Sequence, residues 1–130
     1  MNKIFPFLIA ISTILTSCEP ALYITFENHT GGYASMKVTV EEPNAFFKMK
    51  AAGVKEIDFT SSAINAVVEY SYGAGHWDSV TISALVKGVS KIEFASGNSV
   101  RVITEQQAIR ALFEENIHGK DRNGITIKIK

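Results

Sequence analysis

The chain has 130 residues, and its 13 basic and 13 acidic side chains give a formal net charge of zero at pH 7. This balance gives no reason to expect a nucleic acid or another polyanion as a partner. Apolar residues make up 46% of the chain, which excludes a disordered polymer, and a single cysteine excludes an internal disulfide. The composition is typical of one modest globular domain.

The N-terminal segment has the organisation of an export signal. It carries one basic residue, Lys3, and then an uncharged and mostly apolar run over residues 4–15. A helix needs roughly 20 residues to cross a bilayer, so this shorter run fits a signal peptide better than a membrane anchor.

The only cysteine of the chain closes this segment. Leu15, Thr16, Ser17 and Cys18 resemble the lipobox of bacterial lipoproteins, in which an aliphatic residue and two small residues precede a cysteine. The resemblance implies that residues 1–17 are cleaved off and that the Cys18 thiol carries palmitate-type acyl chains. Several acyl chains hold a protein firmly at a membrane, because each buried CH₂ contributes about 0.8 kcal/mol. The alternative is that Cys18 is an ordinary buried or reactive cysteine.

By this resemblance the protein belongs to a bacterial cell envelope. We expect the outer membrane, on its periplasmic or surface face, rather than the inner membrane. Residues 18–21 would form a short lipidated tether, and residues 22–130 a single β-rich globular domain.

Alternation of apolar and polar residues dominates this domain and predicts half-buried strands. The residues that share the inner face of the first two strands are Leu22, Ile24, Phe26, Ala34, Met36, Val38 and Val40. Between the two runs, the turn-forming residues 28–32 predict a hairpin.

Six further strands are expected, each bounded by turn residues. They span about residues 45–50, 55–60, 63–72, 79–86, 90–94 and 99–103. Many short strands at this spacing predict a mainly β protein, either an antiparallel β-sandwich or a partly open barrel.

One segment near the C-terminus has helical periodicity. Thr104 and Gln107 have the spacing of a capping box, and Gly119 supplies a stop. The apolar residues that recur at helical spacing are Ile109, Leu112, Phe113 and Ile117. His118 fits as a cation near the end of this single helix. After a turn, residues 125–130 alternate as a final strand, which we expect to be tied into the sheet.

The sequence contains no pattern typical of catalysis or metal binding. His29, His76 and His118 lack metal-ligand spacing, no serine lies in a Gly-x-Ser-x-Gly elbow, and the glycines lack the context of a phosphate loop. We therefore expect no cofactor, no metal and no catalytic activity, and an enzyme is the least favoured alternative.

The stretch from Tyr70 to Asp78 combines features of a binding site. It contains the only tryptophan and two tyrosines on one strand face, beside a glycine-bearing loop. Such aromatic side chains suit sugar rings or a partner protein. The candidate contact residues are Tyr72, His76, Trp77, Asp78 and Phe46, the last because its phase with Lys48 and Lys50 places it on the exposed face of its strand. The alternative, which we favour, is that Tyr70, Tyr72 and Trp77 belong to the core, with Trp77 plugging one end of the fold.

Two classes of function remain. The first is a non-catalytic, membrane-anchored accessory protein whose domain binds another envelope component. The second is a small glycan-binding or ligand-binding lipoprotein that uses the loop from Tyr70 to Asp78. The expected partners are the membrane, through acyl chains on Cys18, and an envelope protein or glycan, and we expect the soluble part to be a monomer. Exposure of the loop would separate the two classes.

Overall fold

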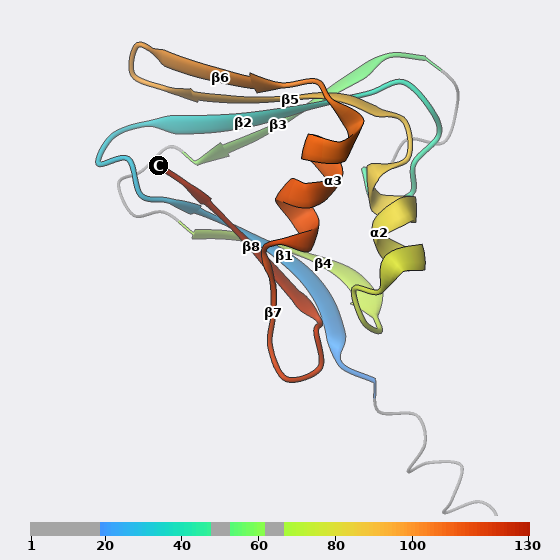
Figure 1. The fold of residues 1–130 in the computed structure, drawn as a ribbon. Helices are drawn as coiled ribbons and strands as arrows, with labels where there is room; N and C mark the ends of the chain where they lie inside the picture. The colour runs from blue at the N-terminus through green and yellow to red at the C-terminus, as the bar shows by residue number, and fades with distance from the viewer. Residues whose placement is uncertain (1–18, 48–52, 62–66) are drawn as a thin grey trace, which may run out of the picture.

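The protein is described by a computed structural model that covers residues 19–47, 53–61 and 67–130. Two four-stranded sheets pack face to face as a β-sandwich, as the sequence predicts (Figure 1). The sheets are not closed into a barrel, so the barrel alternative does not apply. The predicted signal segment, with Cys18, lies outside the described residues.

The first sheet has the strand order β4-β1-β8-β7. Its strands are β1 (Ala21–Asn28), β4 (Val67–Ala74), β7 (Ile117–His118) and β8 (Gly124–Ile129). Strand β8 pairs in parallel with β1, so the predicted final strand is tied into the sheet beside the first one. Of the strand predicted over residues 63–72, residues 63–66 lie outside the described residues.

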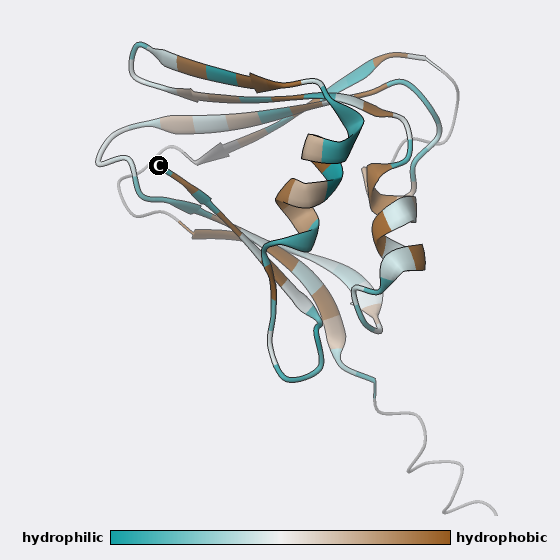
Figure 2. Ribbon diagram, in the orientation of Figure 1, coloured by the Kyte–Doolittle hydropathy of each residue, from teal (hydrophilic) through white to brown (hydrophobic). Residues whose placement is uncertain are grey.

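The second sheet has the strand order β3-β2-β5-β6 and is antiparallel throughout. Its strands are β2 (Ala34–Val40), β3 (Lys55–Ser61), β5 (Val89–Ser96) and β6 (Ser99–Ile103). All seven residues predicted to face inward from β1 and β2 are buried. Apolar and polar segments alternate along the strands (Figure 2), as a sheet with one covered face requires.

The predicted hairpin between the first two strands is wrong. Residues 28–32 do form a turn, but β1 pairs with β4 and β8 whereas β2 pairs with β3 and β5, so the turn carries the chain from one sheet to the other. The buried Asn28 holds this crossing: its Oδ1 accepts a hydrogen bond from the backbone N–H of Thr30, and its Nδ2 donates to the carbonyl of Gly32. Turn residues fix the local bend, but they do not determine which strands pair.

Two other predicted strands also differ from the structure. Residues 45–47 form a turn, and the remainder of the predicted strand over 45–50 lies outside the described residues. The segment predicted as a strand over 79–86 is a helix, α2 (Ser79–Val86).

Helix α2 begins at the N-cap residue Asp78, although the alternation of apolar and polar residues over 79–86 predicts a strand. The carboxylate of Asp78 accepts hydrogen bonds from the backbone N–H and the hydroxyl of Thr81, both at 2.8 Å. Ile82 and Leu85, three residues apart, are buried, whereas Val80 is 79% exposed. The apolar residues therefore alternate in sequence but pack with the helical period.

The predicted C-terminal helix is present and is shorter than expected. It is α3 (Gln106–Glu114), with Ile109 and Phe113 buried and Leu112 half-buried, as predicted. Its N-cap is Glu105, which makes no side-chain cap hydrogen bond, so the capping box predicted from Thr104 is wrong.

The end of α3 differs from the prediction because the chain turns into a strand. Ile117 and His118 form β7, where Ile117 pairs with Ile125 of β8, so neither residue lies on the helix. The side-chain amide of Asn116 donates to the carbonyl of Leu112 and thereby completes the helix end before the strand begins.

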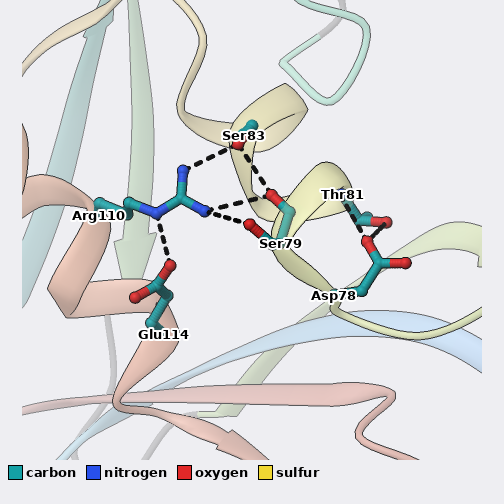
Figure 3. Close-up of polar contacts among 6 residues, drawn as sticks. All are labelled: Asp78, Ser79, Thr81, Ser83, Arg110 and Glu114. Atoms are coloured by element: carbon teal, nitrogen blue, oxygen red, sulfur yellow. Dashed lines mark hydrogen bonds and ion pairs between the residues drawn. The ribbon is translucent and has the colours of Figure 1, made fainter.

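Helices α2 and α3 lie where the two sheets diverge (Figure 1), and α3 contacts β5 of one sheet and β8 of the other. Arg110 of α3 joins the two helices (Figure 3). Its guanidinium donates to the hydroxyl of Ser83 and to the carbonyl and hydroxyl of Ser79, and it pairs with Glu114 one turn along α3. The guanidinium of Arg110 thus finds its hydrogen-bond partners within α2 and α3, and we assign this cluster a structural role.

Candidate functional site

A concave feature of the described residues lies between β3 and β4. Each of these strands forms one edge of its sheet, and between them is a pocket of about 690 Å³. We call it the edge groove. Its apolar lining comes from Phe46, Phe47, Ile57, Phe59, Tyr70 and Tyr72. Small-molecule sites fall in the range of roughly 300 to 1,000 Å³ and have linings of this kind.

One part of the groove wall is a cluster of aromatic rings around Phe59. This buried ring stacks on Phe26 with 4.8 Å between the ring centroids, and it makes edge contacts with Tyr70 at 5.1 Å and Phe47 at 6.1 Å. Such ring pairs contribute roughly 0.5 to 1.5 kcal/mol each beyond their burial. The cluster therefore joins the groove wall to the core of the sandwich.

A second part of the wall is formed by Phe46 and Tyr72, whose ring centroids are 5.4 Å apart. Both rings also approach Trp77, at 5.7 Å and 6.3 Å respectively. Phe46 is half-buried and packs against the core, so its predicted position on an exposed strand face is wrong. The groove wall is therefore in direct contact with the only tryptophan of the chain.

Asn44 positions the turn that carries Phe46. Its side-chain Oδ1 accepts a hydrogen bond from the backbone N–H of Phe46 at 2.9 Å. Its Nδ2 donates to the carbonyls of Leu85 and Lys87, both at 2.9 Å, at the C-terminal end of α2. Asn44 is only 3% exposed, and its hydrogen bonds satisfy carbonyls that a helix end leaves without partners. The aromatic turn is thus fixed to the end of a helix.

The faces of β3 separate its charged residues. Lys55, Ile57 and Phe59 share one face. Their partners in β2 are the buried residues Val40, Val38 and Met36, and this face therefore points into the sandwich. Glu56 and Asp58 lie on the opposite face, where Glu56 pairs with Lys37 at 3.6 Å. Although their side chains alternate between the two faces of the strand, Lys55, Glu56 and Asp58 all line the groove.

Tyr72 stays neutral at physiological pH. Burial of the hydroxyl, and secondarily the neighbouring Tyr70, raise the pKa of Tyr72 to about 12. Tyr72 therefore adds no negative charge to the groove wall at this pH.

The residues predicted as contacts in the loop from Tyr70 to Asp78 do not form one site. Trp77 has no exposed surface, and its ring N–H donates to the carbonyl of Tyr23 at 3.3 Å, so it is not available to a ligand. This agrees with the core interpretation of Trp77. His76 is exposed, and its Nδ1 contacts the backbone carbonyl of Asp121. Asp78 caps α2, and the hydrogen bonds from Thr81 lower the pKa of its carboxyl group.

Of the predicted contact residues, only Tyr72 and Phe46 line the groove. Sequence reasoning missed Lys55, Ile57 and Phe59. Their alternation in β3 was a usable signal, but nothing local in the sequence indicates that β3 and β4 face each other across the sandwich.

The described residues contain neither a candidate metal centre nor a candidate membrane-spanning helix. No group of three or more His, Cys, Asp or Glu side chains in this part of the chain is placed to hold a metal ion. No helix within the same residues is both long enough and apolar enough to cross a membrane. Comparison with known proteins returned no matching family model, curated protein or solved structure.

Proposed function

We propose that the protein is a non-catalytic binding protein of a bacterial envelope, anchored through acyl chains on Cys18, and that the edge groove is its binding site. The observation that carries this proposal is the aromatic lining of a pocket of about 690 Å³ between two edge strands. Anchoring rests on the lipobox resemblance of residues 15–18.

The groove supports an apolar ligand better than a glycan. Sugar recognition needs several convergent polar groups, whereas the inward-facing residues of β3 and β4 are mostly aromatic or aliphatic. With Trp77 buried, the loop from Tyr70 to Asp78 offers no exposed indole on which a sugar ring stacks. A concave pocket of this size also fits a small molecule better than the flat surface of a partner protein.

The binding half of the proposal is tested with a neutral fluorescent probe, N-phenyl-1-naphthylamine, added to a chain that begins at Glu19. We expect saturable binding, and we expect Ile57→Ser to weaken it about fivefold, because part of an apolar side chain is lost from the wall. Val80→Ser is the matched control, since this exposed aliphatic residue of α2 does not line the groove. Equal affinities of the two variants would exclude the groove as the binding site.

The anchoring half is tested by metabolic labelling with a tagged palmitate. The wild-type chain is expected to take up label, and Cys18→Ser is expected to lose it and to be uncleaved or released in soluble form. Label that persists in Cys18→Ser would contradict lipidation at this residue.

A further inference from the structure

We propose that one end of the domain lies against the phospholipid headgroups of the membrane. This surface, which we call the tether end, consists of Pro20, Ala21, the loop 73–78 and the loop 119–123. The inference rests on the anchoring half of the proposed function, and it adds which surface of the domain the membrane covers.

The first step of the argument is that the segments of the tether end form one unit. The backbone N–H of Gly75 donates a hydrogen bond to the carbonyl of Pro20 at 2.8 Å. The side-chain amide of Asn123 donates to the carbonyl of Ala21 at 2.9 Å. The start of β1 is therefore bonded to both loops. These segments lie at the end of the molecule opposite to the C-terminus (Figure 1).

The second step is the length of the tether. By the lipobox resemblance, Cys18 carries the acyl chains, and only Glu19 separates it from Pro20. Two residues of extended chain span at most about 7 Å, and the headgroup region of a leaflet is itself roughly 5 to 7 Å thick. Because Pro20 is bonded to the domain, a tether of this length does not lift the tether end clear of the headgroups.

The third step is charge. The exposed carboxylates and permanent cations at the tether end and on its tether are Glu19, Asp78, Lys120, Asp121 and Arg122. Basic residues are not in excess, so this end has no polybasic patch that attracts anionic lipid. The mixture of both signs instead suits the ammonium and phosphate groups of a zwitterionic headgroup layer. The tether, and not net charge, therefore brings this surface to the membrane.

The orientation also sets which part of the edge groove is nearest to the membrane. Strand β4 runs toward the tether end, where Ala74 pairs with Ala21. Along the strand, Tyr72 is about 7 Å from Ala74, whereas Tyr70 is about 13 Å away. The Tyr72 end of the groove therefore lies on the membrane side of the domain.

The test uses the full-length acylated protein in phosphatidylcholine vesicles that contain a lipid with a nitroxide on its headgroup. Cys18 is the only cysteine and its thiol is acylated, so a cysteine introduced elsewhere takes up a thiol-reactive fluorophore alone. Asp121→Cys places the fluorophore in the tether end, and Asn98→Cys places it in the exposed turn between β5 and β6, at the opposite end (Figure 1). We expect the nitroxide lipid to quench most of the emission from position 121 and little of that from position 98. Partial replacement of phosphatidylcholine by phosphatidylglycerol should leave this difference unchanged.

A second variant tests the role of the tether. A linker of about ten Gly and Ser residues, with a root-mean-square span of roughly 17 Å, is inserted between Glu19 and Pro20. It should reduce the quenching at position 121 toward that at position 98. Quenching at position 121 that persists with the linker would overturn the tether as the cause of the contact.

Equal quenching at the two positions without the linker would overturn the inference, and so would stronger quenching at position 98. Flotation of the vesicles measures anchoring separately. Protein that does not float would reject the anchoring half of the proposed function and the inference together, whereas floating protein with equal quenching would reject the inference alone.

Discussion

Helices α2 and α3 cover the apolar inner faces of the diverging sheets on one side of the sandwich, whereas on the β3–β4 side the described residues leave aromatic side chains lining a pocket. On the helical side, Ile82, Leu85, Ile109 and Phe113 are at most 1% exposed. On the groove side, Phe46, Ile57, Tyr70 and Tyr72 are only partly buried. Under the proposed function, the helical side contributes mainly to stability and the groove side mainly to binding.

The largest expected effect comes from the helical side. Phe113→Ala removes a fully buried ring from α3 and should lower the free energy of unfolding by about 3 to 5 kcal/mol. Its neighbour Glu114 is exposed and makes one ion pair with Arg110, so Glu114→Ala should change the free energy by about half a kcal/mol or less. Urea melts of a chain beginning at Glu19 measure both values. Equal midpoints would show that α3 is not packed between the sheets.

The next effect concerns Asn44, which connects the two regions. Asn44→Ala leaves carbonyls at the end of α2 without their donor and frees the turn that carries Phe46. We expect a loss of roughly 2 to 3 kcal/mol in the free energy of unfolding, because a buried hydrogen-bonding group loses several partners at once. We also expect weaker binding of the neutral probe. Asn98→Ala, in the exposed turn between β5 and β6, is the control. If Asn44→Ala lowered stability without any change in probe affinity, the turn would not form part of the groove.

A smaller and pH-dependent effect is expected at the start of α2. Hydrogen bonds from the backbone N–H and then the hydroxyl of Thr81 lower the pKa of Asp78 below its unfolded value. The stabilisation by this carboxylate is therefore fully present above the unfolded pKa of about 4 and is lost as pH falls through the folded value. In urea melts, the difference between wild type and Asp78→Ala should shrink between about pH 7 and pH 3. Asp78→Asn keeps a capping acceptor and should remain close to wild type at neutral pH. A difference that does not vary with pH would mean that the charge of Asp78 plays no part in the cap.

Sequence periodicity predicts much of the sandwich because alternation reports directly which side of a strand is buried. It identifies the inner faces of β1 and β2 and the strand character of β8. Periodicity gives the wrong element at residues 79–86. The alternating apolar residues there also fit a helix, which Asp78 caps and in which Ile82 and Leu85 are buried. Periodicity also fails at residues 28–32, because the pairing of β1 with β4 depends on contacts between segments distant in sequence.

The candidate site is less predictable for the same reason. Tyr72 and Phe46 are recognisable from their residue types, but the groove exists only because β3 and β4 are the facing edges of different sheets. The inward position of Ile57 follows only from its register with the buried Val38 of β2. The alternation of residues within one strand does not indicate which distant strand will lie beside it.

The central claim, that the groove binds an apolar ligand beside a sealed core, is tested most directly by the emission of Trp77. This residue is the only tryptophan, is fully buried, and lies within 5.7 Å of Phe46 and 6.3 Å of Tyr72, measured between ring centroids. In the chain from Glu19, acrylamide should quench its emission weakly, whereas N-phenyl-1-naphthylamine in the groove should accept its excitation energy and quench it saturably. Ile57→Ser should shift the quenching curve to about fivefold higher probe concentration. Strong quenching by acrylamide, or probe binding that leaves the Trp77 emission unchanged, would contradict the account.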